Sequence, residues 1–186
     1  AFEGGGLLAN NSGGPFMLND GPTLQTQTMM NAMGSANVAQ RGEWLYPAGG
    51  SQNINDYSRV ILNGVNVGRN DFQTRVNDLE MAGFYNPTNG LASDVLESFW
   101  QKFDGENDPY ARQFSEGLAN VDHPLLILAH SQGTLTVANA AQYHGLPAGS
   151  HIEFISPAIS TWRAEAAANA AGATHNYNLP YGDGAA

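Results

Sequence analysis

The 186-residue sequence predicts an α/β domain with a mainly parallel β-sheet, helices on both faces of the sheet, and a glycine-rich N-terminal arm. From Tyr57 onward, short apolar or β-branched runs alternate with segments of helical periodicity. The run PLLILA at 124–129 is apolar throughout, which is typical of a strand buried on both faces of a parallel sheet. The length suits one domain.

Residues 1–56 are expected to form an arm or linker, and residues 57–186 the folded domain. Residues 1–50 contain ten glycines and only four charged side chains, with no sustained periodicity. From Tyr57 onward, apolar residues recur at regular spacing. The start at Ala1 and the absence of a clear terminating element suggest a piece of a larger protein, truncated at its C-terminus.

The first half of the domain alternates strands and helices. The run RVILNGVNV at 59–67 predicts a buried strand that ends at an Asn-Gly turn. Asp71 is expected to cap a helix with an apolar face, and 83–86 (GFYN) to form a short strand. Two helical stripes follow, one over 96–103 and one that starts at Asp108. The acidic run DGEND at 104–108 does not meet a calcium-loop pattern and is interpreted as a solvated linker.

The second half continues this alternation. After the strand at 124–129 we expect a helix over 132–143, a strand over 151–155, a helix over 161–171 and a last strand over 174–178. Parallel strands joined in this way require right-handed crossovers.

Ser131 stands out because it lies between the buried strand and the helix after it, with small residues two positions away on both sides, Ala129 and Gly133. This is the pattern of a nucleophile elbow, a turn so tight that its flanks must be small and its hydroxyl rises above the sheet edge. Ala129 replaces the usual first glycine, which the need for small size tolerates. The alternative is a serine that caps an ordinary helix.

The supporting groups of a serine nucleophile are less complete. The backbone N–H of Gln132 would supply one donor to an oxyanion, and Gly64 or Val65, in the loop after an early strand, the second. Asp183 is the candidate for the acid, because it is the only Asp after Ser131 and follows the last strand, which matches the order serine, acid, histidine that goes with such an elbow. None of the five histidines fits the base: His123, His151 and His175 lie at strand starts, His144 lies a helix away, and His130 points elsewhere. We therefore expect the catalytic histidine to lie beyond residue 186 or to have been lost.

On these residues the chain resembles the α/β-hydrolase superfamily of lipases and esterases, over about residues 57–183. The order of ILNGVNV, FYNPTNG and AHSQGT is similar to lipase-like toxin domains at the C-termini of large bacterial repeat proteins such as the Rhs family. The resemblance implies a serine esterase, lipase or phospholipase without a cofactor, delivered as an effector from a carrier protein and countered by an immunity protein. Its substrate would be a lipid or a small ester.

Several other functions are disfavoured. The net charge is −10 and Lys102 is the only lysine, so the positive surface that nucleic acids require is missing. No histidine or carboxylate pair has metal-ligand spacing, and the chain has no cysteine. Two alternatives remain open: a noncatalytic binding module with the hydrolase fold, and an inactive fragment of a larger carrier.

Overall fold

The computed structural model describes residues 41–64, 67–87 and 105–179. Its strands are β1 (Glu43–Leu45), β2 (Arg59–Leu62), β3 (Ala82–Tyr85), β4 (Leu126–His130), β5 (His151–Ile155) and β6 (Thr174–Asn178). Its α-helices are α2 (Arg69–Leu79), α4 (Pro109–Leu118), α5 (Gly133–Asn139) and α6 (Thr161–Ala170). Short 3₁₀ turns cover Ile54–Asp56 and Gly105–Asn107, and a π-helical segment covers Ala140–His144.

The six strands form one sheet in the order β1-β3-β2-β4-β5-β6. All neighbours pair in parallel except β1, which is antiparallel to β3. The predicted α/β class and mainly parallel sheet are therefore confirmed. Strand β1 lies within the segment 1–56 that the sequence assigns to an arm, so the boundary at residue 57 is corrected: the sheet begins at Glu43. Residues 1–40, which hold most of the expected arm, lie outside the described residues.

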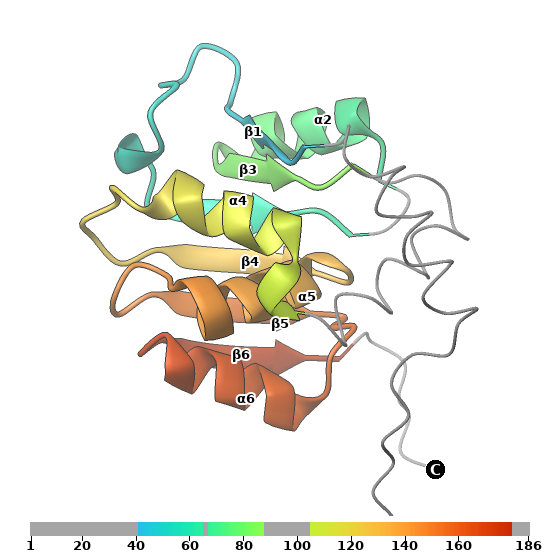
Figure 1. The fold of residues 1–186 in the computed structure, drawn as a ribbon. Helices are drawn as coiled ribbons and strands as arrows, with labels where there is room; N and C mark the ends of the chain where they lie inside the picture. The colour runs from blue at the N-terminus through green and yellow to red at the C-terminus, as the bar shows by residue number, and fades with distance from the viewer. Residues whose placement is uncertain (1–40, 65–66, 88–104, 180–186) are drawn as a thin grey trace, which may run out of the picture. The chain divides into compact units, whose positions relative to one another are not determined.

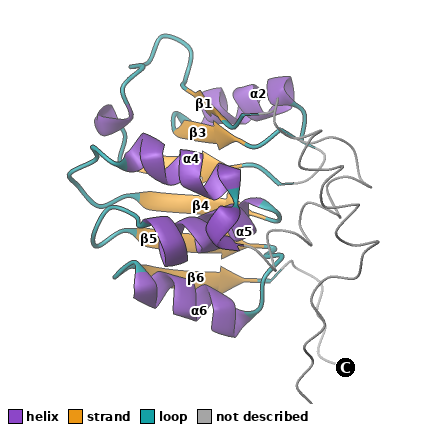
Figure 2. Cartoon of the chain, in the orientation of Figure 1, coloured by secondary structure: helices purple, strands orange, loops and turns teal. Residues whose placement is uncertain are grey.

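Helices cover both faces of the sheet (Figure 1; Figure 2). On one face, Gly83 of β3 lies so close to α2 that a Cβ there would come within 2.4 Å of Val76 and 2.9 Å of Phe72. On the other face, Phe84 contacts Phe114 of α4 with ring centroids 5.3 Å apart. Because successive side chains of a strand point to opposite faces, the two helices lie on opposite sides of β3.

Side-chain hydrogen bonds join α5 to its neighbours on the α4 side. Asn139 donates to Asp108, the N-cap of α4, at 3.0 Å, and accepts from Arg163 of α6 at 2.7 Å. Asp108 is buried and also accepts from the backbone amides of Tyr110 and Ala111. The interpretation of 104–108 as a solvated linker is therefore wrong at Asp108, because the helix cap draws its carboxylate into the protein.

The predicted element boundaries are correct in part. Strands β5 and β6 coincide with the predicted ranges. Helix α2 begins at Arg69, with Gly68 as its N-cap, so the prediction that Asp71 caps it is wrong. Asp71 lies instead in the first turn, where its negative charge favours the helix N-terminus. The predicted helix 132–143 divides into α5 and the π-helical segment, and the predicted helix 96–103 lies outside the described residues.

The strand order reverses direction between β2 and β4. The connection from β2 through α2 leads to β3 on one side of β2, whereas β4, β5 and β6 extend the sheet on the other side. In open α/β sheets such a reversal leaves a crevice outside the carboxyl ends of the two central strands, where ligands bind. The residues that follow β2 and β4 are Asn63, Gly64 and Ser131.

Candidate functional site at the end of β4

Ser131 follows β4 directly and has a left-handed backbone, with φ of +50°. Only two other non-glycine residues in the described ranges have positive φ, Glu80 and Ser156. A left-handed conformation costs a residue with a Cβ about 1–2 kcal/mol, and such strain is concentrated at functional sites. This is the strained strand-to-helix turn that a nucleophile elbow requires.

Hydrogen bonds hold the Ser131 backbone in this conformation. Its amide donates to the Ile155 carbonyl of β5 at 3.0 Å. Its carbonyl accepts from the Thr134 amide at 3.0 Å and from the Thr134 hydroxyl at 2.5 Å. The same hydroxyl accepts from the Ala158 amide at 3.1 Å, which ties the turn to the loop after β5. Sequence reasoning missed Thr134, because its partner Ala158 is distant along the chain and no local pattern identifies it.

Both small residues that flank Ser131 are enclosed. Ala129 is fully buried in the sheet. A Cβ on Gly133 would lie 2.7 Å from the Asn63 carbonyl oxygen and 2.9 Å from the Leu62 Cβ. The end of β2 therefore lies against the start of α5 and leaves no room for a side chain at position 133.

Gly64 approaches Ser131 closely. A Cβ on Gly64 would lie 2.9 Å from the Ser131 Cβ and 2.7 Å from Nδ1 of His130. The Gly64 nitrogen lies two bonds from the added Cβ, and the Ser131 hydroxyl oxygen lies one bond from the Ser131 Cβ. With bonds of about 1.5 Å, the nitrogen therefore lies within about 7 Å of the hydroxyl oxygen. The fold thus brings together Gly64 and Ser131, two of the residues chosen from the sequence. Val65, the alternative second donor, lies outside the described residues.

Gln132 is the next residue after Ser131 and lies at the N-terminal end of α5. The residue is only 2% exposed, and its side-chain Nε2 has no hydrogen-bond partner among the described residues. In the same ranges, no group accepts a hydrogen bond from its backbone amide. Within the described part of the chain, this amide is therefore an unpaired donor.

All five histidines of the chain lie in the described ranges, and none of them is a hydrogen-bond partner of the Ser131 hydroxyl there. His123 bonds to the Tyr57 carbonyl at 3.0 Å and lies before β4. His151 and His175 lie at the starts of β5 and β6, and His144 ends the π-helical segment. None of the described hydrogen bonds joins a histidine ring to the Ser131 hydroxyl. Asp183, the predicted acid, lies outside the described residues.

His130, the residue before Ser131, is directed toward Gly64. Burial, and to a smaller extent the positive charge of Arg75, lowers the pKa of His130 below its ordinary value. The ring is therefore neutral at pH 7, and its buried Nδ1 has no hydrogen-bond partner within the described part of the chain.

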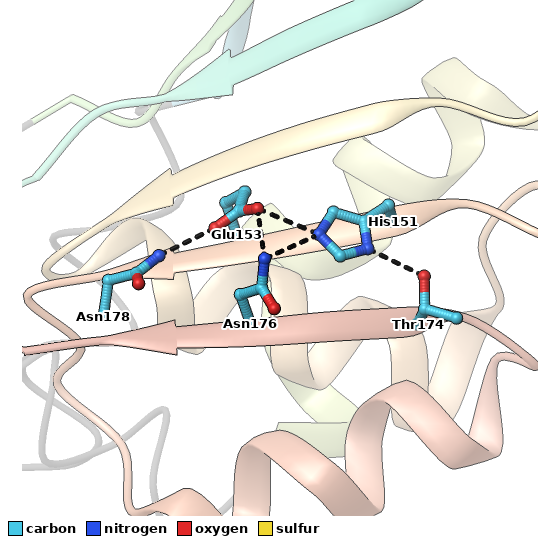
Figure 3. A network of polar contacts seen from close by, with 5 residues as sticks. All are labelled: His151, Glu153, Thr174, Asn176 and Asn178. Atoms are coloured by element: carbon cyan, nitrogen blue, oxygen red, sulfur yellow. Dashed lines mark hydrogen bonds and ion pairs between the residues drawn. The ribbon is translucent and has the colours of Figure 1, made fainter.

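A separate polar network lies on β5 and β6 (Figure 3). Glu153 accepts hydrogen bonds from His151 at 2.9 Å and from Asn176 and Asn178 at 2.7 Å each. Burial alone would raise the pKa of Glu153, but these hydrogen bonds outweigh it and lower the pKa. His151 also bonds to Thr174 at 2.7 Å. With its donors and acceptors already paired, the network stabilises the contact between the two strands.

Two further candidate features are absent from the described residues. No cluster of three or more histidine, cysteine or acidic side chains there could hold a metal ion. None of the helices in the same ranges has the length and apolar character needed to cross a membrane. The candidate site therefore consists of Ser131 and the backbone groups around it.

Comparisons with protein-family models, with curated proteins and with solved structures found no match to this chain. The geometry alone therefore describes the site: a hydroxyl on a strained turn at the reversal of strand order, with the backbone of Gly64 beside it and, next in the chain, the Gln132 amide, which pairs with no described residue. Such a site offers a nucleophile and donors for developing negative charge.

Proposed function

We propose that this chain is a serine hydrolase that acts on carboxylic esters, with Ser131 as its nucleophile. The observation that carries the proposal is the left-handed backbone of Ser131 at the carboxyl end of β4, next to Gly64. A structural serine in a helix cap gains nothing from this strain, whereas a nucleophile gains exposure at the sheet edge.

In the proposed reaction, the Ser131 oxygen attacks the ester carbonyl carbon and its proton passes to a general base. The Gln132 amide and the Gly64 or Val65 amide donate to the resulting oxyanion. The carbon–oxygen bond to the leaving group then breaks, the alcohol departs with a proton, and water hydrolyses the acyl-enzyme. On the resemblance noted above, Asp183 would orient the base, and lipid esters are the proposed substrate class of an effector.

The described histidines do not supply this base, so the chain taken alone should turn esters over slowly. Hydrolases that lose a triad member keep a residual acceleration of about 10³–10⁴ over water, which comes from the oxyanion hole and from binding. A highly reactive fluorophosphonate should therefore still modify Ser131 selectively, because its phosphoryl oxygen occupies the position of the oxyanion.

The test is intact-mass analysis of the 186-residue chain after incubation with a fluorophosphonate. One adduct is expected on the parental chain and none on Ser131→Ala. Ser156→Ala is the matched control, because Ser156 is also left-handed (φ of +45°) and follows the neighbouring strand β5. It should be modified at the parental rate. An adduct that persists in Ser131→Ala would show that the assignment is wrong.

A noncatalytic binding module is the second candidate, and the absence of a histidine bonded to Ser131 in the described ranges favours it. Such a protein would have the same fold and the same strained serine, but its hydroxyl would not react. A parental chain that takes no adduct while remaining folded would support this second function.

A further inference from the structure

Asn63, the first residue after β2, makes three hydrogen bonds through its side chain. Its Nδ2 donates to the Asn86 carbonyl at 2.8 Å, and its Oδ1 accepts from the Asn86 amide at 2.6 Å. The same Nδ2 donates to the Gly64 carbonyl at 3.1 Å. The side chain is buried, with the residue only 2% exposed.

These bonds allow the main chain to depart from the sheet after β2, while the backbone groups of Asn86, the residue after β3, still have hydrogen-bond partners. The regular pairing of β2 with β3 ends at Leu62 and Phe84. A carboxamide carries the same donor and acceptor as a peptide group, so the Asn63 side chain takes the place of the next backbone pairing and satisfies the backbone N–H and C=O of Asn86. The main chain at Asn63 and Gly64 is thereby free to turn toward β4.

The turn places Gly64 against Ser131. The Asn63 carbonyl lies next to Gly133, and Gly64 lies next to the Cβ of Ser131. The bond from Asn63 Nδ2 to the Gly64 carbonyl restrains the Gly64 backbone directly. Nothing among the described residues accepts a hydrogen bond from the Gly64 amide.

We infer that Asn63 is a positioning residue, which holds the Gly64 backbone at the distance and orientation needed to stabilise an oxyanion formed on Ser131. This inference rests on the proposed function. Asn63 does not touch the reacting atoms; it acts through Gly64. Because no described histidine assists Ser131, the remaining reactivity should depend strongly on this positioning.

The test compares fluorophosphonate labelling of the parental chain with Asn63→Ala, following the maximal labelling rate and the half-saturating concentration separately. A displacement of about 1 Å at a reacting centre can cost about 10²-fold in rate. We expect the maximal rate to fall about 10- to 100-fold and the half-saturating concentration to change less than about twofold. The reason is that the hydrogen bond from the Gly64 backbone to the oxyanion forms in the transition state and not when the reagent first binds.

Ser150→Ala is the matched control for lost stability. Ser150 is also fully buried, and its hydroxyl donates to the Pro147 carbonyl and accepts from the Leu125 amide. It lies at the amino ends of the parallel strands, whereas Asn63 lies at their carboxyl ends. Ser150→Ala should lower the melting temperature without lowering the labelling rate at a temperature where the chain is folded. Asn63→Asp is the second variant, since it retains an acceptor for the Asn86 amide and loses both donated bonds; its labelling should fall as in Asn63→Ala.

The outcomes separate the two proposals. If the parental chain is labelled at Ser131 and the Asn63 variants are labelled equally fast, the positioning role is overturned and the proposed function stands. If the folded parental chain takes no adduct, both fail. If both Asn63 variants lose cooperative melting while Ser150→Ala retains it, Asn63 serves folding and the positioning role is overturned.

Discussion

The substitution Gly64→Ala tests the close approach between the ends of β2 and β4. The added methyl would lie 2.9 Å from the Ser131 Cβ, 2.7 Å from Nδ1 of His130 and 3.3 Å from the His130 carbonyl oxygen. Carbon atoms in contact prefer about 3.5–4.0 Å. The two chain segments must therefore separate by about 0.6–1 Å, because two of the three neighbours are held close to the backbone.

This displacement has two expected consequences. Overpacking of this kind lowers the free energy of unfolding by about 1–3 kcal/mol, which corresponds to a melting temperature lower by roughly 2–12 °C in a domain of this size. Moving Gly64 away from Ser131 by nearly 1 Å should also reduce labelling of Ser131 by fluorophosphonate up to about 10²-fold.

The assay is intact-mass kinetics at a temperature where parent and variant are both folded, with melting followed by circular dichroism. Gly68→Ala is the control, since its backbone φ is −65° and, among the described residues, its added methyl would meet only the Asp71 carboxylate at 3.4 Å. Its melting temperature and labelling should stay close to those of the parent. Labelling of Gly64→Ala at the parental rate would refute the reasoning, because the methyl would then fit without moving the site.

Three further predictions concern single side chains. Ser131→Gly should abolish labelling and raise the free energy of unfolding by about 0.5–1 kcal/mol, since glycine accepts φ of +50° without strain; chemical denaturation measures this, and a destabilised variant would argue against strain at Ser131. Glu153→Gln should lower the free energy of unfolding at pH 7 by about 1 kcal/mol, and the melting temperature with it. Because the folded-state pKa of Glu153 is lowered, its contribution is present above the ordinary glutamate pKa and is lost as pH falls through the lowered value. The two melting curves should therefore converge in acid, and a constant difference down to pH 2 would contradict the assignment. Asp108→Ala should cost about 2 kcal/mol in urea unfolding, because it removes the cap of α4 and the acceptor of the Asn139 amide; Asp108→Asn, which can still cap, should cost less, and equal losses would exclude the cap as the cause.

Local sequence patterns predict the fold class and most of the elements. Strands β5 and β6 were predicted to the residue, because each is a short run with a helix or a turn on both sides. The strand-to-helix turn at Ser131 is also predicted from the sequence, since the buried strand, the small flanks and the helix around it lie within a few residues of one another. The three-residue strand β1 was missed because Glu43, Trp44 and Leu45 show no alternation and lie among glycines and polar residues.

Which of these elements come into contact could not be predicted from local patterns. Gly64 was a candidate from the sequence, but its contact with Ser131 depends on β2 and β4 being neighbours at the reversal of strand order. The roles of Asn63 and Thr134 likewise depend on partners on other elements, Asn86 and Ala158. Periodicity and turn patterns act over a few residues, whereas strand order is set by how all the apolar faces are buried together, and so the sequence could identify the serine but not its surroundings.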